Sequence, residues 1–484
     1  MSVFKKLFKQ TFIYGLATVL PRILAVILVP LYVKVLLPEE YGIYSTVMAF
    51  LILGNVLLSY GMETAFFRFV TKDVAQQKIV QSTTLTSLTV STMVFLGVTL
   101  LFRDHIARVS EFRPEYVTYG LWILALDALA VLPFVWFRVN EEPMRYAVIK
   151  IVNVVINLGF NLFFFLILPK LAAGSAYYNS LWFPENKVAY VFIANLIASA
   201  ATLLLVLPLY VKIGFGFSKN IWKQMLKYAL PVLVAGIAFS INEAFDRILL
   251  KYLLPEAIAE IQVGLYSACY KLGMFMTLFV MAFRLGIEPF FFNHSGHENA
   301  KQTYAAITKY FTLFGCLILL VVVVYIDVFK KILIPNSAYW EALKIVPIIL
   351  LANLFLGIYH NLSVWYKVTD RTKFGAYISI FAALVTLVLN YVLIPPIGYM
   401  GSAIATLAAY GSMMVLSYLY GRKYYNVPYQ VKRLSGYLLL ATGFSALSFY
   451  VFHRNIWSGT ALLILFAAIL FYSEKNEFLK IIRK

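Results

Sequence analysis

Several charged side chains lie within long apolar stretches of this sequence, and a charge in such a place needs a chemical reason. Arg22 follows Pro21 in an apolar run, twelve residues before Lys34, with no acidic residue within a helical turn of it. A guanidinium offers a planar fork of donors that suits bidentate recognition of phosphate. At the centre of a bilayer a charge costs roughly 3 kcal/mol on insertion scales. Arg22 is therefore a candidate for a phosphate-binding cavity.

A second apolar stretch carries polar and charged residues within six positions: Asn242, Glu243, Asp246 and Arg247. Glu243 and Arg247 are four residues apart and can pair on one helical face, so they could equally be a structural pair. Lys271 adds another cation to an apolar segment. A buried carboxylate can bind H⁺ or Na⁺ and so couple transport to an ion gradient. Three residues are candidates for this role: Asp127, Glu243 and Asp246. For Asp127 the alternative is neutralisation of a nearby Lys or Arg.

Weaker candidates are amide and glutamate side chains at regular spacing. One row occupies a single helical face at i, i+4 and i+8: Asn153, Asn157 and Asn161. Such a row, like Asn242, could line a cavity, but asparagines in membrane helices more often hold helices together. Glu63 and Glu288 each follow a Gly-x pattern near a cytoplasmic helix end, where an intracellular gate or a fixed helix terminus explains them equally well, so they are candidate gate residues. The two cysteines, Cys269 and Cys316, have no metal-ligand spacing.

Composition decides which kind of protein positions these residues. The 484 residues are 62% hydrophobic and 13% charged, with a mean hydropathy of +0.82. A soluble protein is nearer half apolar and a quarter charged. The apolar residues fall in continuous runs long enough to cross a bilayer, without the alternation of barrel strands. The sequence therefore predicts an all-α polytopic membrane protein.

Hydropathy predicts about 14 transmembrane helices. The net charge of +19 comes from Lys and Arg residues that flank apolar segments, and most of them fall on the side of the N-terminus. This bias places both termini in the cytoplasm, and the first apolar run is expected to be a retained helix rather than a cleaved signal. The expected helices are 11–36, 43–67, 82–102, 116–139, 145–168, 187–211, 227–253, 261–286, 305–329, 341–366, 374–394, 399–420, 433–452 and 456–473.

An internal repeat organises these helices. The pattern Lys-x-Leu-Leu-Pro-Glu at 34–39 recurs at 251–256, and Gly-x-Glu-x-x-Phe-Phe at 61–67 recurs at 286–292. The copies begin six helices apart, so they have the same orientation and predict two parallel six-helix lobes about a central cavity. Two C-terminal helices fall outside the repeat. The predicted domains are 1–212 (N-lobe), 213–226 (amphipathic linker), 227–421 (C-lobe) and 422–484 (two helices and a tail).

These motifs together resemble the polysaccharide biosynthesis (Wzx-type) flippases over residues 10 to about 420. The resemblance rests on Pro21-Arg22, LLPEEYGIYS, GMETAFFRF, INEAFDRILL, GLYSACYKLG, GIEPFFF and the IPPIGYMGSA turn. It implies kinship with multidrug and toxin extrusion exporters and lipid II flippases, and a cationic cavity in which Arg22, Asp246, Arg247 and Lys271 match charged family positions. The lipid II flippases usually have Arg-Asp where this chain has Arg22-Ile23, which favours an O-antigen, capsule or exopolysaccharide unit.

The resemblance implies a flippase that moves an undecaprenyl-diphosphate-linked oligosaccharide from the inner to the outer leaflet of a bacterial inner membrane by alternating access. Arg22, Arg247 and Lys271 would offset the diphosphate charge, and the asparagines would contact sugars. Coupling would run through H⁺ or Na⁺, without another cofactor. The expected partners are the lipid-linked oligosaccharide and membrane lipids, with a polysaccharide polymerase and glycosyltransferases as further candidates.

Two other functions remain open. A drug exporter of the related extrusion family is the first, although drug cations favour an anionic cavity and three of the deepest charges here are basic. A membrane-bound polymerase or transferase is the second, and it needs an outer loop with catalytic residues, whereas 169–186 offers only Glu185 as an acid. We therefore expect a protein that is not an enzyme. Nucleic-acid binding has no support, because the basic residues are scattered among the loops.

Overall fold

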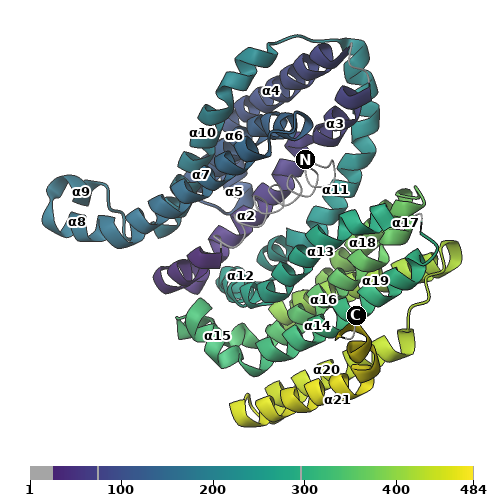
Figure 1. Cartoon of the computed structure of the whole chain (residues 1–484). Helices are drawn as coiled ribbons and strands as arrows, with labels where there is room; N and C mark the ends of the chain where they lie inside the picture. Colours follow the sequence, from purple (N-terminus) through teal and green to yellow (C-terminus); the bar gives the residue numbers. More distant parts are fainter. Residues whose placement is uncertain (1–25, 73–75, 295–296, 483–484) are drawn as a thin grey trace. The chain divides into compact units, whose positions relative to one another are not determined.

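The computed structural model describes residues 26–72, 76–294 and 297–482, and these residues form helices and short connections (Figure 1). The chain folds as two compact units, the first ending at Gly264 and the second beginning at Leu265. Arg22 lies outside the described residues, as do the side chains of Glu288 and of residues 476–482. The prediction of a helical membrane protein is confirmed for the described part of the chain, which contains no strand.

The first unit is a bundle built around α6. An 18-residue window of α6 is 78% buried, more than in any other apolar helix of the described residues. Proline occupies the first turn of α2, α6 and α7, where its missing N–H costs no intrahelical hydrogen bond. The helices of this unit are Val26–Val35, α2 (Pro38–Ser59), α3 (Met62–Lys72), α4 (Gln77–Leu101), α5 (Arg103–Ser110), α6 (Pro114–Val139), α7 (Pro143–Leu162), η2 (Phe163–Ile167), α8 (Leu168–Gly174), α9 (Ala176–Ser180), α10 (Lys187–Ile213), α11 (Lys219–Leu253) and the first part of α12 (Glu256–Tyr270).

The second unit is built around α14 and α16. α18 and α19 form a tight hairpin at Gly398, whose φ of 57° favours glycine, and a Cβ on Gly401 would lie 2.6 Å from the main-chain oxygen of Leu393. The remaining helices are the end of α12, η3 (Lys271–Gly273), α13 (Met274–His294), α14 (Ala300–Val324), α15 (Ile326–Leu333), η4 (Ser337–Ile345), α16 (Val346–Leu362), α17 (Val364–Val368), α18 (Lys373–Ile397), α19 (Tyr399–Tyr424), α20 (Val431–Ala446), η5 (Leu447–Val451) and α21 (Ile456–Ile482).

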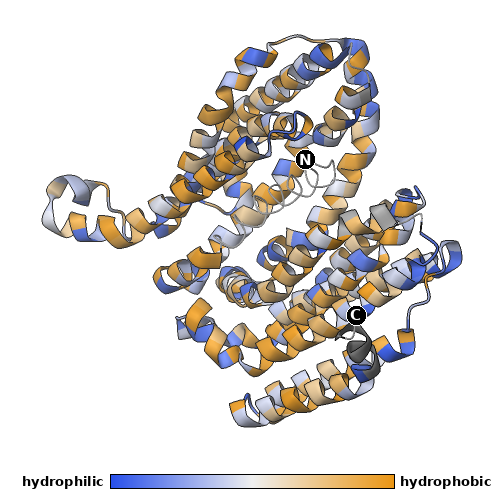
Figure 2. Cartoon of the chain, in the orientation of Figure 1, coloured by the Kyte–Doolittle hydropathy of each residue, from blue (hydrophilic) through white to orange (hydrophobic). Residues whose placement is uncertain are grey.

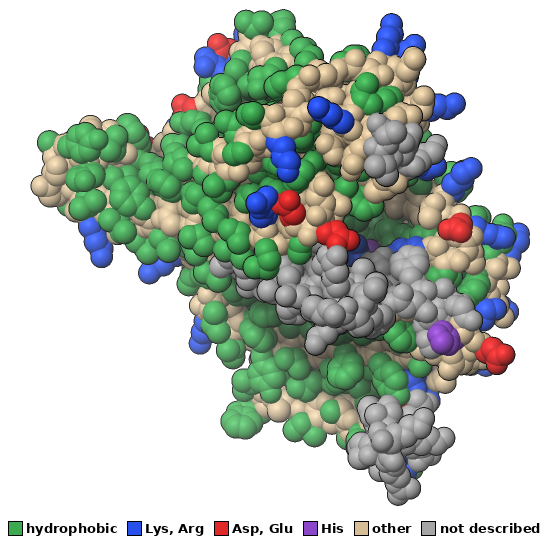
Figure 3. All heavy atoms as spheres, turned by 45° about the horizontal axis from the view of Figure 1, so that its top comes forward, with side chains coloured by type: hydrophobic (Ala, Val, Ile, Leu, Met, Phe, Trp, Pro, Cys, Tyr) green, Lys and Arg blue, Asp and Glu red, His purple; other side chains and the backbone are tan. Residues whose placement is uncertain are grey.

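Thirteen helices of the described residues are long and apolar enough to cross a bilayer, and the shorter helix Val26–Val35 precedes them. They follow the fourteen predicted segments in order. Hydrophilic residues gather in connections and near helix ends, while the helix flanks are hydrophobic (Figure 2). Figure 3 shows hydrophobic side chains over much of the face that it presents. Many large hydrophobic side chains are exposed, for example Val155 at 57% and Leu204 at 69%. A surface of this kind suits a lipid environment, so the chain is a polytopic integral membrane protein.

The boundary between the compact units differs from the lobe boundary that the repeat predicts. α11, predicted to open the C-lobe, packs along α2 and α3 of the first unit. The predicted linker does not stand apart either, because its second half belongs to α11 and its first half is hydrogen-bonded to α4. Thr86 Oγ1 donates to the Gly216 oxygen at 3.0 Å, and Trp222 Nε1 donates to Ser87 Oγ at 2.8 Å. The division into parallel lobes stays a prediction from the repeat.

The two C-terminal helices are joined to the second unit by a buried ionic network. Lys309 of α14 lies 3.0 Å from the Glu474 carboxylate of α21, and their side chains are 4% and 0% exposed. Arg433 and Tyr437 of α20 contact the other oxygen of Glu474, at 3.1 and 2.8 Å. α20 and α21 lie alongside α14 in Figure 1. Because breaking a buried ion pair costs several kcal/mol, these helices are integral to the unit.

Candidate functional site

The charged residues of α11 form a compact local group. Arg247 Nη1 lies 3.0 Å from Asp246 Oδ1, and the two side chains are 13% and 5% exposed. The same carboxylate oxygen accepts a hydrogen bond from the Arg247 main-chain N–H at 2.8 Å. Glu243 contributes its main-chain oxygen, which accepts from Arg247 Nη1 at 3.1 Å. The Arg247 guanidinium thus contacts two oxygens of its own helix, and one of them belongs to the Asp246 carboxylate.

Asp127 lies at a polar junction inside the first unit. Ser199 of α10 donates to Asp127 Oδ1 at 2.7 Å, and the Asn55 side chain of α2 lies near the carboxylate. Lys150 of α7 is close enough to interact with this carboxylate, and its ammonium lies 4.1 Å from the Phe134 ring centroid. A carboxylate surrounded by hydroxyl and amide groups has the chemistry to bind a proton or a hard cation.

The asparagine row of α7 faces α10. The row consists of Asn153, Asn157 and Asn161. Asn153 Nδ2 donates to Thr202 Oγ1 at 2.9 Å, and Asn157 Nδ2 donates to Asn195 Oδ1 at 2.8 Å. Asn161 accepts from the Tyr32 hydroxyl at 2.8 Å and is fully buried. In this conformation the row makes hydrogen bonds between helices, the arrangement expected of interhelical contacts in a membrane.

Sequence reasoning missed the face of α10 that joins Asp127 to the asparagine row. Asn195, Ser199 and Thr202 have the spacing i, i+4, i+7, so they lie on one side of α10. Ser199 contacts Asp127, and the other two contact the row. The spacing of these three polar residues in an otherwise apolar helix is the signal that could have identified this face. The structure therefore brings Asp127 and the asparagines of α7 together.

The other predicted site residues lie elsewhere. Asn242 is buried in α11, 8% exposed. Lys271 opens η3 in the second unit and is partly buried. Glu63, at the start of α3, forms an ion pair with Arg138 of α6. The structure describes the backbone but not the side chain of Glu288, and Arg22 is outside the described residues. Within the described residues, no three His, Cys, Asp or Glu side chains gather as a metal site.

Sequence comparison assigns the family. A family model described as "Polysaccharide biosynthesis protein" matches residues 7–283, more than half of the chain. The chain belongs to the polysaccharide biosynthesis protein family. A second family model, described as MatE, matches residues 231–392. A search of curated proteins by sequence gave no match. The predicted family membership is therefore confirmed.

Solved structures with the same fold are transporters. Lipid II flippase MurJ in an inward closed conformation aligns with a TM-score of 0.71 and 14% identity, over 96% of this chain and 99% of that one. A multidrug resistance MATE family transporter of the MOP superfamily, in its inward-facing conformation, aligns with a TM-score of 0.60 and 16% identity, over 88% and 95%. A structure described as the outward-facing conformation of a multidrug resistance MATE family transporter aligns with a TM-score of 0.56 and 16% identity, over 89% of this chain and 95% of that one. At these low sequence identities the similarity establishes only a common fold. This member of the polysaccharide biosynthesis family therefore has the same fold as these transporters.

Proposed function

We propose that this protein is a flippase that moves an undecaprenyl-diphosphate-linked oligosaccharide from the inner to the outer leaflet of a bacterial inner membrane, for O-antigen, capsule or exopolysaccharide assembly. The observation that carries the proposal is the match of residues 7–283 to the polysaccharide biosynthesis family. The fold supports it, because the similar MurJ structure is that of a lipid II flippase. The proposed movement is alternating access of two helical lobes.

The proposed role of the intramembrane cations is to offset the diphosphate charge. Arg247 is supported by its position on α11, where Asp246 holds its guanidinium in an apolar segment. Arg22 and Lys271 join it on the strength of their sequence positions. A phosphate would add a favourable partner for each cation, since charges in a low-dielectric environment gain most from opposite charges nearby. The prenyl tail would stay in lipid, and Asn242 and the asparagines of α7 would contact sugars.

The proposed coupling group is Asp127. Its hydrogen bond with Ser199 joins α6 to α10, and Asn55 of α2 lies near it, so a change in its protonation or in a bound Na⁺ would alter how these helices pack. Glu243 and Asp246 are further candidates. Glu63 and Glu288 would act as gate residues. Glu63 forms an ion pair with Arg138, and breaking or re-forming such a pair could open or close a gate. A polysaccharide polymerase and glycosyltransferases are proposed partners, because such a flippase would act between the enzymes that build the lipid-linked unit and the enzyme that polymerises it.

The test is complementation of a deletion strain, with surface polysaccharide as the readout. Arg247→Gln should reduce surface polysaccharide at least tenfold and accumulate lipid-linked units at the cytoplasmic face, with normal amounts of protein in the membrane. Arg103→Gln is the matched control, because Arg103 is exposed and pairs only weakly with its neighbour Asp104. Wild-type polysaccharide in strains carrying Arg22→Gln, Arg247→Gln and Lys271→Gln together would refute the cationic-site proposal.

A drug exporter is the second candidate, favoured by the MatE match over residues 231–392 and by the MATE structures with the same fold. Under that function, the deletion strain would become sensitive to cationic drugs and keep its surface polysaccharide. The flippase proposal expects the reverse: lost polysaccharide and unchanged drug sensitivity.

A further inference from the structure

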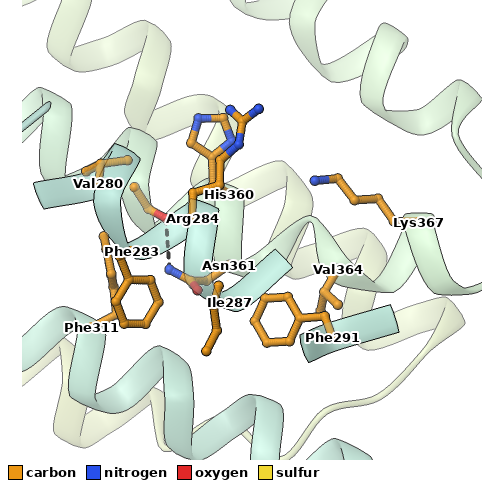
Figure 4. A pocket seen from close by; sticks show the side chains of 11 residues that line it. Val280, Phe283, Arg284, Ile287, Phe291, Phe311, His360, Asn361, Val364 and Lys367 are labelled. Carbon is orange, nitrogen blue, oxygen red and sulfur yellow. Dashed lines mark hydrogen bonds between the residues drawn. The ribbon is translucent and has the colours of Figure 1, made fainter. Parts of the chain in front are cut away.

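Two pockets of the second unit are lined by basic side chains, and they differ in the space that they enclose. Figure 4 shows the first, between α13, α14, α16 and α17, with Arg284, His360 and Lys367 in its lining. Phe283 packs on Phe311 there with ring centroids 4.8 Å apart, and about 10 Å³ remains, room for one water. The second pocket, where α19 passes to α20, has a volume of about 590 Å³. Ligand pockets measure roughly 300–1,000 Å³, so of these two the second has room for a ligand.

Three consecutive segments form this larger pocket. They are the last turns of α19, residues 426–430 of the connection and the first residues of α20. Val427 anchors the connection, because it is 5% exposed and belongs to an apolar cluster with Tyr304 of α14. The rings of Tyr418 in α19 and Tyr429 in the connection lie 6.4 Å apart, within the range of aromatic contacts. Packing therefore holds the walls of the pocket in place.

The pocket is lined by cations and, among the described side chains, by no acidic residue: the cations are Arg422, Lys432 and Arg433. Arg433 already has partners, since its Nε lies 3.1 Å from Glu474 Oε1 and its Nη1 donates to Gln430 Oε1 at 3.3 Å. Arg422 and Lys432 are exposed, and within the described part of the chain neither side chain forms an ion pair or a hydrogen bond. These two charges are therefore the ones that a ligand can meet.

Each of these two cations has an exposed apolar side chain two turns away on its own helix, toward the membrane interior. Val415, Tyr418 and Arg422 have the spacing i, i+3, i+7, so they share one face of α19, and Val415 is 48% exposed. Lys432 and Leu439 have the same separation in α20, and Leu439 is 74% exposed. Seven residues of helix span about 10 Å. Both helices are long and apolar enough to cross a bilayer, so each presents a cation near its end and an apolar side chain about 10 Å deeper.

This arrangement has the chemistry of a lipid with an anionic headgroup. An arginine fork and a lysine ammonium are the side chains that bind phosphate, and both occur in the pocket. The excess of Lys and Arg predicts that this connection faces the cytoplasm, where basic residues attract the anionic lipids of the inner leaflet. A free phosphate would leave the apolar side chains uncovered, and the cation of a zwitterionic headgroup would be repelled by the basic pair.

We propose that the pocket between the end of α19 and the start of α20 binds the headgroup of an anionic glycerophospholipid, with its phosphate on Arg422 and Lys432. The two acyl chains then lie along Val415 and Leu439. The bound lipid links α19, which packs on α16 and α18, to α20, which packs on α14, and so stabilises the second unit. This site is additional to the proposed flippase function, which gives the pocket no role.

The test is native mass spectrometry of the full-length protein in detergent, titrated with dioleoyl phosphatidylglycerol or dioleoyl phosphatidylcholine. Wild-type protein should bind the anionic lipid at least fivefold more tightly, and Arg422→Gln with Lys432→Gln should abolish that preference. Lys219→Gln with Lys223→Gln is the matched control, because it removes two exposed charges of the first unit, outside the pocket. Thermal unfolding checks that each variant is folded. Phosphatidylglycerol should raise the thermal midpoint of the wild type and the control but not of the pocket variant.

Two further measurements distinguish a lipid from a free phosphate. Glycerol 3-phosphate in hundredfold excess should displace little of the lipid, and Val415→Ser with Leu439→Ser should weaken lipid binding at least threefold. Complete displacement, or no effect of the two serines, would overturn the lipid as ligand. A preference for phosphatidylglycerol that persists without Arg422 and Lys432, or that the control loses equally, would overturn the site. Arg247→Gln should keep this lipid binding while losing polysaccharide export, so the two proposals fail by different measurements.

Discussion

The two copies of the repeated sequence pattern form the same structure at one end and different structures at the other. At the first end, Leu37 and Leu254 both adopt an extended conformation before a proline, and a new helix starts at once: α2 at Pro38 and α12 at Glu256. The glycines that follow pack against the opposite copy. A Cβ on Gly42 would lie 1.9 Å from the Glu260 oxygen, and one on Gly264 would lie 1.8 Å from the Pro38 oxygen.

At the other end the copies diverge. Gly61 has a φ of 72°, separates α2 from α3, and lies so close to α11 that a Cβ would be 2.5 Å from the Ala229 oxygen. Its counterpart Gly286 lies inside the continuous helix α13, with no described atom within 4 Å of a Cβ position. The same Gly-x-Glu motif therefore occurs at a helix break in one copy and inside a continuous helix in the other. Backbone contacts with neighbouring helices, rather than the motif, determine whether the helix breaks.

The repeated lysines differ in the same way. Lys34 of the first copy is exposed. Lys251 of the second is 4% exposed, lies 2.9 Å from Glu260 Oε1 and 3.8 Å from Glu111 Oε2, and stands 4.3 Å from the Phe112 ring centroid. One copy has thus become a buried ionic contact and the other a surface charge. Equivalent substitutions in the two copies should have unequal effects.

The largest effect is expected at the paired glycines. Gly264→Leu places a side chain where Pro38 already lies, so α2 and α12 must separate, at a cost of about 3 kcal/mol in stability. An introduced Ala259→Cys, at a buried position of α12, should then react with an impermeant maleimide at least ten times faster. Gly97→Leu is the control, because that position is open. Unchanged labelling would mean that this glycine contact does not hold the helices together.

The next largest difference is expected between the two lysines. Lys251→Met leaves Glu260 without its cation and should lower the free energy of unfolding by about 2 kcal/mol, less than for a fully buried pair because Glu260 is 21% exposed. Lys34→Met should change it by less than about 0.5 kcal/mol. Reversible unfolding of both variants in detergent gives the comparison. Equal effects would show that the two copies are equivalent at this end after all.

A smaller effect is expected at the other end of the repeat. Gly61→Ala should destabilise the protein by about 2 kcal/mol or less, because alanine must adopt a left-handed conformation and approach the Ala229 oxygen. Gly286→Ala should stabilise α13 by up to about 1 kcal/mol, since alanine is the better helix former and has room. Shifts of opposite sign in the thermal midpoint support the divergence described above, and shifts of one sign contradict it.

The smallest effect is expected for the Glu63–Arg138 ion pair. The two side chains are 45% and 37% exposed, so Glu63→Gln should cost at most about 1 kcal/mol. If Glu63 acts as a gate, the same change should still lower polysaccharide export by more than its small loss of stability explains. Arg145→Gln, which removes an exposed pair with Glu142, is the control for stability alone. Export equal to wild type would remove Glu63 from the gating proposal.

The sequence predicted the helices well because hydropathy and proline act locally. Continuous apolar runs, with Pro38, Pro114 and Pro143 in first turns, are enough to locate the spans within a few residues. The face carried by Asn153 and Asn157 was also predictable, because it depends only on helical periodicity.

What could not be predicted depends on contacts between distant segments. The spacing of Glu243 and Arg247 indicated a side-chain pair, yet the guanidinium contacts the Asp246 carboxylate, which also accepts from the Arg247 N–H. Nor did the repeat indicate that α11 would pack with α2 and α3, because a main-chain approach such as that of Gly61 to Ala229 leaves no hydropathy signal.

The Lys309–Glu474 pair sets a condition on how the chain is made. The two residues are 165 positions apart in the sequence. At roughly 5–20 residues per second, the ribosome makes Glu474 about 8–33 s after Lys309. During that interval Lys309 has been made and its carboxylate partner has not. The ion pair that ties α21 to α14 therefore forms only after the C-terminal helix has been made.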